Sequence, residues 1–173
     1  YCLTCQNNLR CFDFARSCVV YNDKAKEIVR GLKFGHRKYF GKYVSNFLID
    51  RYAECFSDID IDFIVPVPLT KKRKSERGFN QAEVISEKFA KHYGIKIRTD
   101  VVEKIRQNDE QAKLSGKERA ENVVGVYSVM NKDAVKDKRI LIVDDVMTTG
   151  STGSELAKVF IKASAKNVYL LTF

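Results

Sequence analysis

The chain has 173 residues, of which 45% are hydrophobic, and this size suits one α/β domain with a small appendage. Five cysteines at irregular spacing exclude the disulfide framework of a small secreted protein, and the sequence has no basic-then-apolar signal segment and no long apolar span. We therefore expect a cytoplasmic protein without a transmembrane segment. The formal net charge of +9 favours anionic partners, either nucleic acid or phosphorylated metabolites.

The first 21 residues carry most of the cysteines. Cys2 and Cys5 form a C-x-x-C pair, which is half of a zinc knuckle, whereas Cys11 and Cys18 do not repeat that spacing. A second pair upstream of the tyrosine on which the sequence opens would complete a Zn²⁺ site; the alternative is a set of ordinary small cysteines. We expect residues 1–21 to be a partial zinc-ribbon-like segment and residues 22–173 to form the main domain.

Two helices are predicted next, and neither carries a pattern typical of catalysis. The first follows the cap residue Asp23 and ends at Gly31 or Gly35. The second has the spacing of a core-facing stripe. Its stripe residues are Val44, Phe47, Leu48, either Arg51 or Tyr52, and Cys55. We interpret both helices as scaffold.

A buried strand is predicted over Asp62–Val67, and a strongly basic segment follows it. Such a density of lysine and arginine usually indicates a solvated face or a nonspecific anion patch. This segment, however, lies between a strand and a helix, so we expect its cations at the carboxyl end of the sheet. Asn80, with Glu83 three residues later, predicts the N-cap of that helix.

The helix that begins after Asn80 is predicted to end at Gly94, and a long polar stretch comes later in the chain. The core-facing stripe of this helix is Ala82, Ile85, Phe89 and Tyr93. The strand candidates on either side of the polar stretch are Ile95–Ile97, Val101–Ile105 and Val123–Val129. The stretch Arg106–Asn122 has no apolar periodicity, and such length is unusual in a compact domain. We therefore expect a mobile functional loop there.

The most informative stretch is Arg139–Thr152. Ile140–Val143 is an unbroken apolar run, typical of a strand buried on both faces of a parallel sheet. Two acids end it, and small hydroxyl residues around a glycine then precede an amphipathic helix. The helix N-terminus can bind a phosphate, and the acids can accept hydrogen bonds from sugar hydroxyls about one ribose away. The stretch therefore predicts a site for a ribose 5-phosphate, at the carboxyl end of a parallel sheet that Val168–Leu171 closes.

This stretch resembles the signature of type I phosphoribosyltransferases. The resemblance implies an α/β fold with a mainly parallel sheet flanked by helices. It also implies that Asp144 and Asp145 contact the ribose hydroxyls of phosphoribosyl pyrophosphate, with Mg²⁺ on the ligand. The residues around the 5-phosphate would be Thr148, Thr149, Gly150, Ser151 and Thr152.

Two further segments resemble the ComF family of competence proteins, which are phosphoribosyltransferase-like. These are Pro66-Val67-Pro68 followed by Arg77–Gln81, and the polar stretch itself. The resemblance implies a pyrophosphate loop formed by Thr70, Lys71, Lys72, Arg73 and Arg77. It also implies a flexible loop over the substrate that carries Arg106, Gln111, Lys113, Ser115 and Arg119.

Two functions remain open at this point. The first is a ComF-type role in DNA uptake and natural transformation. The protein would then bind a ribose-phosphate ligand and, through Lys71, Lys72, Arg73 and Lys74, single-stranded DNA. The resemblance implies partners such as a DNA-uptake helicase and other competence proteins, through which the protein can lie at the inner face of the membrane. The second function is an active salvage or biosynthetic phosphoribosyltransferase acting on an unidentified nitrogenous base.

Overall fold

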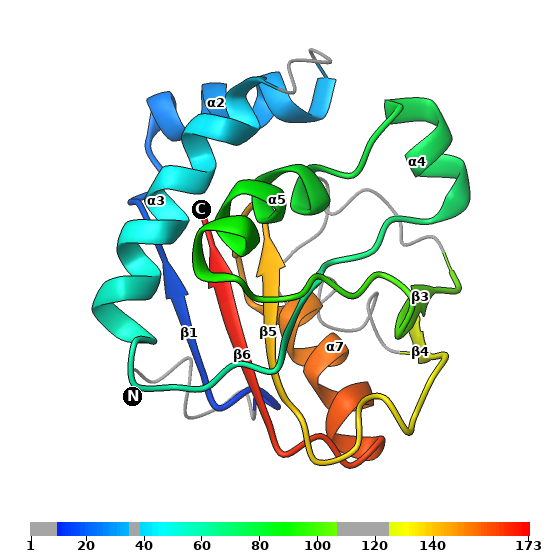
Figure 1. Cartoon of the computed structure of the whole chain (residues 1–173). Helices are drawn as coiled ribbons and strands as arrows, with labels where there is room; N and C mark the ends of the chain where they lie inside the picture. The colour runs from blue at the N-terminus through cyan, green and yellow to red at the C-terminus, as the bar shows by residue number, and fades with distance from the viewer. Residues whose placement is uncertain (1–9, 35–38, 107–124) are drawn as a thin grey trace.

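The computed structural model describes residues 10–34, 39–106 and 125–173. The elements, in chain order, are β1 (Phe14–Ser17), α2 (Asp23–Phe34), α3 (Tyr39–Cys55), β2 (Phe63–Pro66), α4 (Lys71–Arg77), α5 (Gln81–Tyr93), β3 (Val102–Lys104), β4 (Tyr127–Val129), β5 (Arg139–Asp144), α7 (Ser151–Lys162) and β6 (Asn167–Thr172). Figure 1 shows a sheet with helices on both faces, as the sequence predicts.

The main sheet has the strand order β1-β6-β5-β2, and every neighbouring pair is parallel. Strand β5 lies inside the sheet between β6 and β2, and Ile140–Val143 within it is fully buried. The apolar run is buried because helices cover both faces of the sheet. The predicted central strand is confirmed.

Alternate residues of β5 enter two hydrophobic clusters, one on each face of the sheet. Ile140 and Ile142 pack in the cluster that includes Leu156 and Phe160 of α7. Leu141 and Val143 face the opposite cluster, to which α2, α3 and α5 contribute. The three layers are therefore α7, the sheet, and the group of α2, α3 and α5 (Figure 1).

The edge next to β6 differs from the sequence expectation. Val168–Leu171 is a strand as predicted, but β6 is an inner strand, and β1 closes the sheet beside it. Strand β1 comes from the cysteine-bearing segment that we expected to lie outside the domain, so residues 14–17 belong to the sheet. Its sequence, FARS, has no clear alternation, and its partner lies at the far end of the chain. Such non-local pairing leaves little trace in sequence.

Three local predictions also need correction. The basic segment after β2 is not a loop, because Lys71–Arg77 forms the helix α4, with Thr70 as its N-cap and Gly78 as its C-cap. Ile95–Ile97 is not a strand; Ile97 makes only an isolated parallel bridge to Ile64. Phe47 of α3 is 43% exposed rather than part of the core stripe.

The carboxyl ends of the parallel strands meet at one end of the molecule, where α2 and α4 also lie (Figure 1). Ligands of open α/β sheets bind at this end. Within the three described ranges, no helix has the length and apolar character that crossing a membrane requires.

Candidate functional site

A cavity of about 330 Å³ opens at the carboxyl ends of β5 and β6. Most of its wall is the turn between β5 and α7, and the remainder comes from β6 and the region of α2. The lining residues are Tyr21, Lys33, Asp144 to Gly153, Leu170 and Thr172. The structure therefore brings the two predicted ribose acids and the whole predicted phosphate loop into one cavity.

The phosphate loop turns sharply into α7. Gly150 is the N-cap of the helix with φ +76°, a left-handed conformation that glycine adopts readily. The Thr149 Oγ1 atom accepts a hydrogen bond from the Ser151 N–H at 3.3 Å and lies 2.7 Å from the Ser151 hydroxyl. Because Gly150 has no side chain, the N-cap residue itself gives no side-chain hydrogen bond to the first turn of α7. The loop thus presents hydroxyls and a helix N-terminus to the cavity, which is the arrangement that suits a phosphate.

The first turn of α7 packs closely against β6, next to the loop. A Cβ atom added at Gly153 would lie 2.6 Å from Cδ2 of Leu170, so any larger residue at this position would require the Leu170 side chain or the first turn of α7 to shift. On the other side, the Arg10 guanidinium lies against Gly150, where an added Cβ would meet Nη1 at 2.9 Å. The adjacent Cys11 N–H donates to the Ser154 hydroxyl at 3.1 Å. The residues just before β1 therefore pack against the phosphate loop.

Asp144 and Asp145 lie side by side at the end of β5. The Asp145 N–H donates to Oδ1 of Asp144 at 2.8 Å, and Asp145 is only 8% exposed. Burial, and secondly the neighbouring Asp145 carboxylate, raise the pKa of Asp144 well above its ordinary value of 3.8, against the opposing effect of Lys33 and Lys104. The site therefore favours a ligand or cation that stabilises negative charge on Asp144.

Lysine and arginine side chains surround this acid pair. Lys33, in the last turn of α2, forms an ion pair of 2.9 Å with Asp145. Lys104, at the end of β3, is near enough to Asp144, Arg73 and Arg77 to interact with their charges. Burial and the two arginines lower the pKa of Lys104 to about 8, while Asp144 opposes that shift. A small anion entering beside the acids would meet several cations at once.

Arg77 belongs to the same group. Its pKa is lowered by burial and by Arg73, and raised by Asp145. Its guanidinium also donates to Oε1 of Gln81 at 3.0 Å. The carboxyl end of α4 therefore lies close to the acid pair, at the end of the sheet where the sequence analysis expects these cations.

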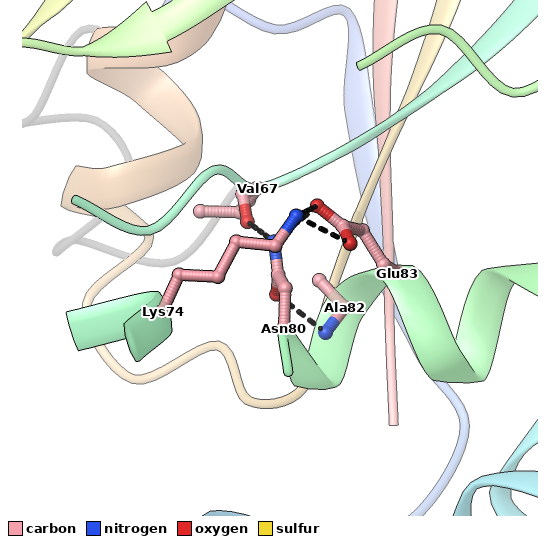
Figure 2. A network of polar contacts seen from close by, with 5 residues as sticks. All are labelled: Val67, Lys74, Asn80, Ala82 and Glu83. Carbon is pink, nitrogen blue, oxygen red and sulfur yellow. Dashed lines mark hydrogen bonds and ion pairs between the residues drawn. The ribbon is translucent and has the colours of Figure 1, made fainter. Parts of the chain in front are cut away.

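Figure 2 shows how α4 is fixed to α5. Lys74 forms a salt bridge of 2.9 Å with Glu83, and the Asn80 side-chain amide donates to the Val67 carbonyl at 3.0 Å. The Ala82 N–H donates to Oδ1 of Asn80 at 3.0 Å, which confirms the predicted N-cap. Lys74 is thus partly engaged within the protein, whereas Lys71 and Lys72 are exposed.

A second cavity, of about 700 Å³, lies between α4 and β3. Its lining includes apolar residues such as Pro68, Leu69 and Ile105, together with Lys71, Lys72 and Lys104. Of the residues predicted for the pyrophosphate, Thr70, Lys71 and Lys72 face this cavity, while Arg73 and Arg77 interact with Lys104.

Of the residues predicted for the flexible loop, Arg106 is the one that lies within the described ranges. The Arg106 guanidinium donates to the Gly125 carbonyl at 2.9 Å, and the Gly125 N–H donates to the buried Glu155 carboxylate at 2.6 Å. The other predicted loop residues, Gln111, Lys113, Ser115 and Arg119, lie outside the described residues.

Metal binding was also predicted from the sequence. Among the described residues, no group of three or more His, Cys, Asp or Glu side chains is arranged to hold a metal ion. Cys2 and Cys5 lie outside this part of the chain, so the zinc site stays a prediction. Burial raises the pKa of Cys18 to about 12, so without a metal its thiol is protonated at neutral pH. The two carboxylates do suit Mg²⁺, which keeps several waters and shares ligand phosphates.

Sequence reasoning missed Lys33, Lys104 and Tyr21. Tyr21 and Lys33 line the cavity from the region of α2, which the sequence indicates only as scaffold. Lys104 lies in a short strand of three residues. None of them belongs to a motif, and only the tertiary arrangement brings them to the acids.

Comparisons with known proteins agree with this geometry. The family model described as "Phosphoribosyl transferase domain" matches residues 52–173. The chain is 33% identical over 106 residues to "Competence protein F" of Haemophilus influenzae, covering 61% of this chain and 46% of that protein. It is 32% identical over 145 residues to "Competence protein ComFC" of Bacillus subtilis, covering 79% and 53%.

"DNA utilization protein YhgH" of Escherichia coli K12 is 28% identical over 151 residues, covering 86% of this chain and 66% of that protein. The chain therefore spans between 46% and 66% of the length of these relatives. Among solved structures, the "allosteric regulatory enzyme of purine biosynthesis" matches with a TM-score of 0.50 at 20% identity, over 77% of this chain and 26% of that one. That likeness concerns the fold alone. The chain belongs to the phosphoribosyl transferase domain family and, within it, to the ComF branch of phosphoribosyltransferase-like proteins.

Proposed function

We propose that this protein binds a ribose 5-phosphate ligand, either phosphoribosyl pyrophosphate or a nucleotide, and single-stranded DNA, and that it acts in DNA uptake in the cytoplasm. The observation that carries the proposal is the meeting of two acids and a phosphate loop in one cavity at the carboxyl end of a parallel sheet. Only two residues lie between Asp145 and Thr148, so the two features are neighbours in the chain as well as in the cavity.

The 5-phosphate end of the ligand fits the start of α7. A phosphate dianion there gains backbone N–H donors, the positive end of the helix dipole and the hydroxyls of Thr149 and Ser151. Arg10, which lies against Gly150, adds positive charge to the same end of the cavity. These groups favour a phosphate over a neutral sugar.

The ribose end fits the acid pair. Carboxylate oxygens accept hydrogen bonds from vicinal hydroxyls, and Asp144 and Asp145 present two such groups next to each other. Mg²⁺ would be held by Asp144, Asp145 and ligand oxygens, mostly through water, and would supply positive charge to the ligand's phosphates.

DNA binding is supported by the charge of the protein and by the names of its relatives. Two of these relatives are called competence proteins and a third a DNA utilization protein. Lys71 and Lys72 are exposed on α4, at the same end of the sheet as the ribose site. On α3, Tyr39 and Tyr43 are 54% and 63% exposed and could stack on unpaired bases. A DNA-uptake helicase and other competence proteins would be the partners.

A second function is favoured by the cations around the acids. In an active phosphoribosyltransferase, a nitrogen nucleophile forms a bond to ribose C1 while the bond from C1 to the pyrophosphate oxygen breaks and pyrophosphate leaves. Lys33, Lys104 and Arg77 would stabilise the negative charge that develops on that leaving group. This assignment needs only positioning and electrostatics, and no covalent help from the protein.

The proposal is tested by calorimetric titration of the protein with phosphoribosyl pyrophosphate and Mg²⁺, compared with a D144N/D145N variant. We expect binding by the parent and a loss of at least about 100-fold in the variant, because two charge-assisted hydrogen-bonding groups are removed. Equal affinity in the two proteins would contradict the ribose assignment. Release of pyrophosphate with any base in a panel would favour the transferase, and its absence alongside binding would favour the ligand-binding role.

A further inference from the structure

Lys33 lies over the acid pair although it comes from a helix outside the sheet. Its Nζ atom is 2.9 Å from Oδ2 of Asp145, and the two side chains are 28% and 12% exposed. Both residues also act on the pKa of the adjacent Asp144. Asp145 raises this pKa, and Lys33 lowers it against the larger effect of burial. Lys33 therefore occupies the same part of the cavity that a ribose would approach.

The backbone beside this lysine is packed into the core. Leu32, the preceding residue, is 1% exposed in the core cluster shared by α2, α3 and α5. The side-chain amide of Gln81 donates to the Leu32 carbonyl at 3.4 Å, and its oxygen accepts from Arg77 at 3.0 Å. The end of α2 is thus connected to the first turn of α5 and to the cationic end of α4. Lys33 and Arg77 approach Asp145 from two different helices.

The stereochemistry of the ligand decides which group on C1 can reach a cation at this position. In phosphoribosyl pyrophosphate the pyrophosphate on C1 lies on the same face of the ring as the 2- and 3-hydroxyls. In a nucleotide the base lies on the opposite face. A carboxylate that accepts hydrogen bonds from these hydroxyls therefore lies next to the pyrophosphate. A cation that is paired with this carboxylate can then also reach the pyrophosphate.

We infer that Lys33 recognises an anionic group on C1 of the ligand, on the hydroxyl face of the ring. In this structure Lys33 is paired with Asp145. When a ligand binds, the ribose hydroxyl takes over Asp145 and the lysine ammonium bonds to the pyrophosphate oxygens. The inference rests on the proposed ribose site and narrows its ligand to phosphoribosyl pyrophosphate in preference to a nucleotide or ribose 5-phosphate.

The remaining cations support this assignment. Lys104, Arg73 and Arg77 interact with one another and with the two acids, so Lys33 would add a further positive charge near the C1 substituent. If the ion pair were purely structural, removing Lys33 would mainly lower stability, because both side chains are largely buried. A structural role also predicts no difference between ligands, whereas recognition of the C1 anion does.

The test compares three ligands on the same variants by calorimetric titration with Mg²⁺ present. The ligands are phosphoribosyl pyrophosphate, ribose 5-phosphate and adenosine 5-monophosphate. The variants are K33Q and K33A, and K26A is the matched control because Lys26 is an exposed lysine of the same helix. For K33Q and K33A, we expect affinity for phosphoribosyl pyrophosphate to fall about 10- to 100-fold, the effect of one missing charge-assisted hydrogen bond. Affinity for ribose 5-phosphate should stay within about twofold or increase, because Asp145 loses its competing partner.

Several outcomes would overturn the inference. A parent that prefers adenosine 5-monophosphate to phosphoribosyl pyrophosphate contradicts the narrowed ligand class. If K33Q weakens phosphoribosyl pyrophosphate and ribose 5-phosphate equally, or weakens neither, Lys33 does not read the C1 anion although the ribose site stands. If the parent binds none of the three ligands, the proposed ribose site itself is wrong, and the inference falls with it. The melting temperatures of K33Q and K33A show whether either variant has lost its fold. If one has, the ligand affinities of the other variant test the inference.

Discussion

Replacing Asp144 with asparagine should make the protein more stable at neutral pH while weakening its ligand binding. The folded protein raises the pKa of this carboxyl through burial and through Asp145, so ionising Asp144 opposes folding. Each pKa unit corresponds to about 1.4 kcal/mol. The opposing effect of Lys33 and Lys104 is already part of this raised pKa. Because water entry and local relaxation reduce the cost of a buried charge, we expect D144N to gain on the order of 1 to 2 kcal/mol in unfolding free energy at pH 7.5.

The sign of the pH dependence follows from the direction of the shift. Above its ordinary pKa of 3.8, Asp144 is ionised in the unfolded chain but still binds a proton in the folded one. The unfolded state therefore binds fewer protons in this window, and the parent loses stability as the pH rises through it. D144N lacks this loss, and an asparagine oxygen can still accept from the Asp145 N–H.

Urea unfolding of the parent and D144N at pH 4, 6 and 7.5 measures the effect. The two unfolding free energies should be close at pH 4 and diverge as the pH rises, with D144N the more stable. A variant that is less stable than the parent at pH 7.5, or a difference that does not change with pH, would refute this electrostatic account. Binding of phosphoribosyl pyrophosphate should fall in the same variant, which identifies a charge kept for function at the expense of stability.

Two further substitutions test the geometry. G153A should lower the unfolding free energy in urea by about 1 to 3 kcal/mol, because its Cβ would lie 2.6 Å from Cδ2 of Leu170 and force α7 away from β6; unchanged stability would mean that the loop is not packed as described. K71A/K72A should weaken binding of a fluorescent single-stranded oligonucleotide at low salt, measured by anisotropy, and should flatten the plot of log K against log salt by about 0.7 for each phosphate that is no longer neutralised.

The oligonucleotide experiment has a matched control. K162A/K166A removes the same charge from the region around the end of α7, where both lysines are exposed. If this control changes the salt slope as much as K71A/K72A does, binding follows net charge and not the α4 surface.

Local patterns explain most of what could be predicted from the sequence. Ile140–Val143 could be predicted as a strand because a strand buried on both faces has an unbroken apolar run. The loop that follows could be predicted because its residues are contiguous in the sequence. The N-cap Asn80 is likewise a local signal. The positions of the two acids and of the loop that follows them could therefore be predicted from sequence, and the structure adds that they share one cavity.

The features that were missed depend on interactions between distant residues. Strand β1 pairs with β6 at the other end of the chain, and Lys33 meets Asp145 only because α2 packs against the sheet. The basic segment was expected to be a loop, yet lysine, arginine and glutamate are good helix formers, and Thr70 and Gly78 provide both caps. Its charge suggested a loop, but its propensity and caps favour the observed helix.

The most direct measurement of the central claim is a crystal structure of the protein grown with phosphoribosyl pyrophosphate and Mg²⁺. The account predicts the 5-phosphate at Thr148–Thr152, the ribose hydroxyls on Asp144 and Asp145, and the pyrophosphate next to Lys33. A ligand bound elsewhere, or one whose phosphate lies away from the start of α7, would contradict it.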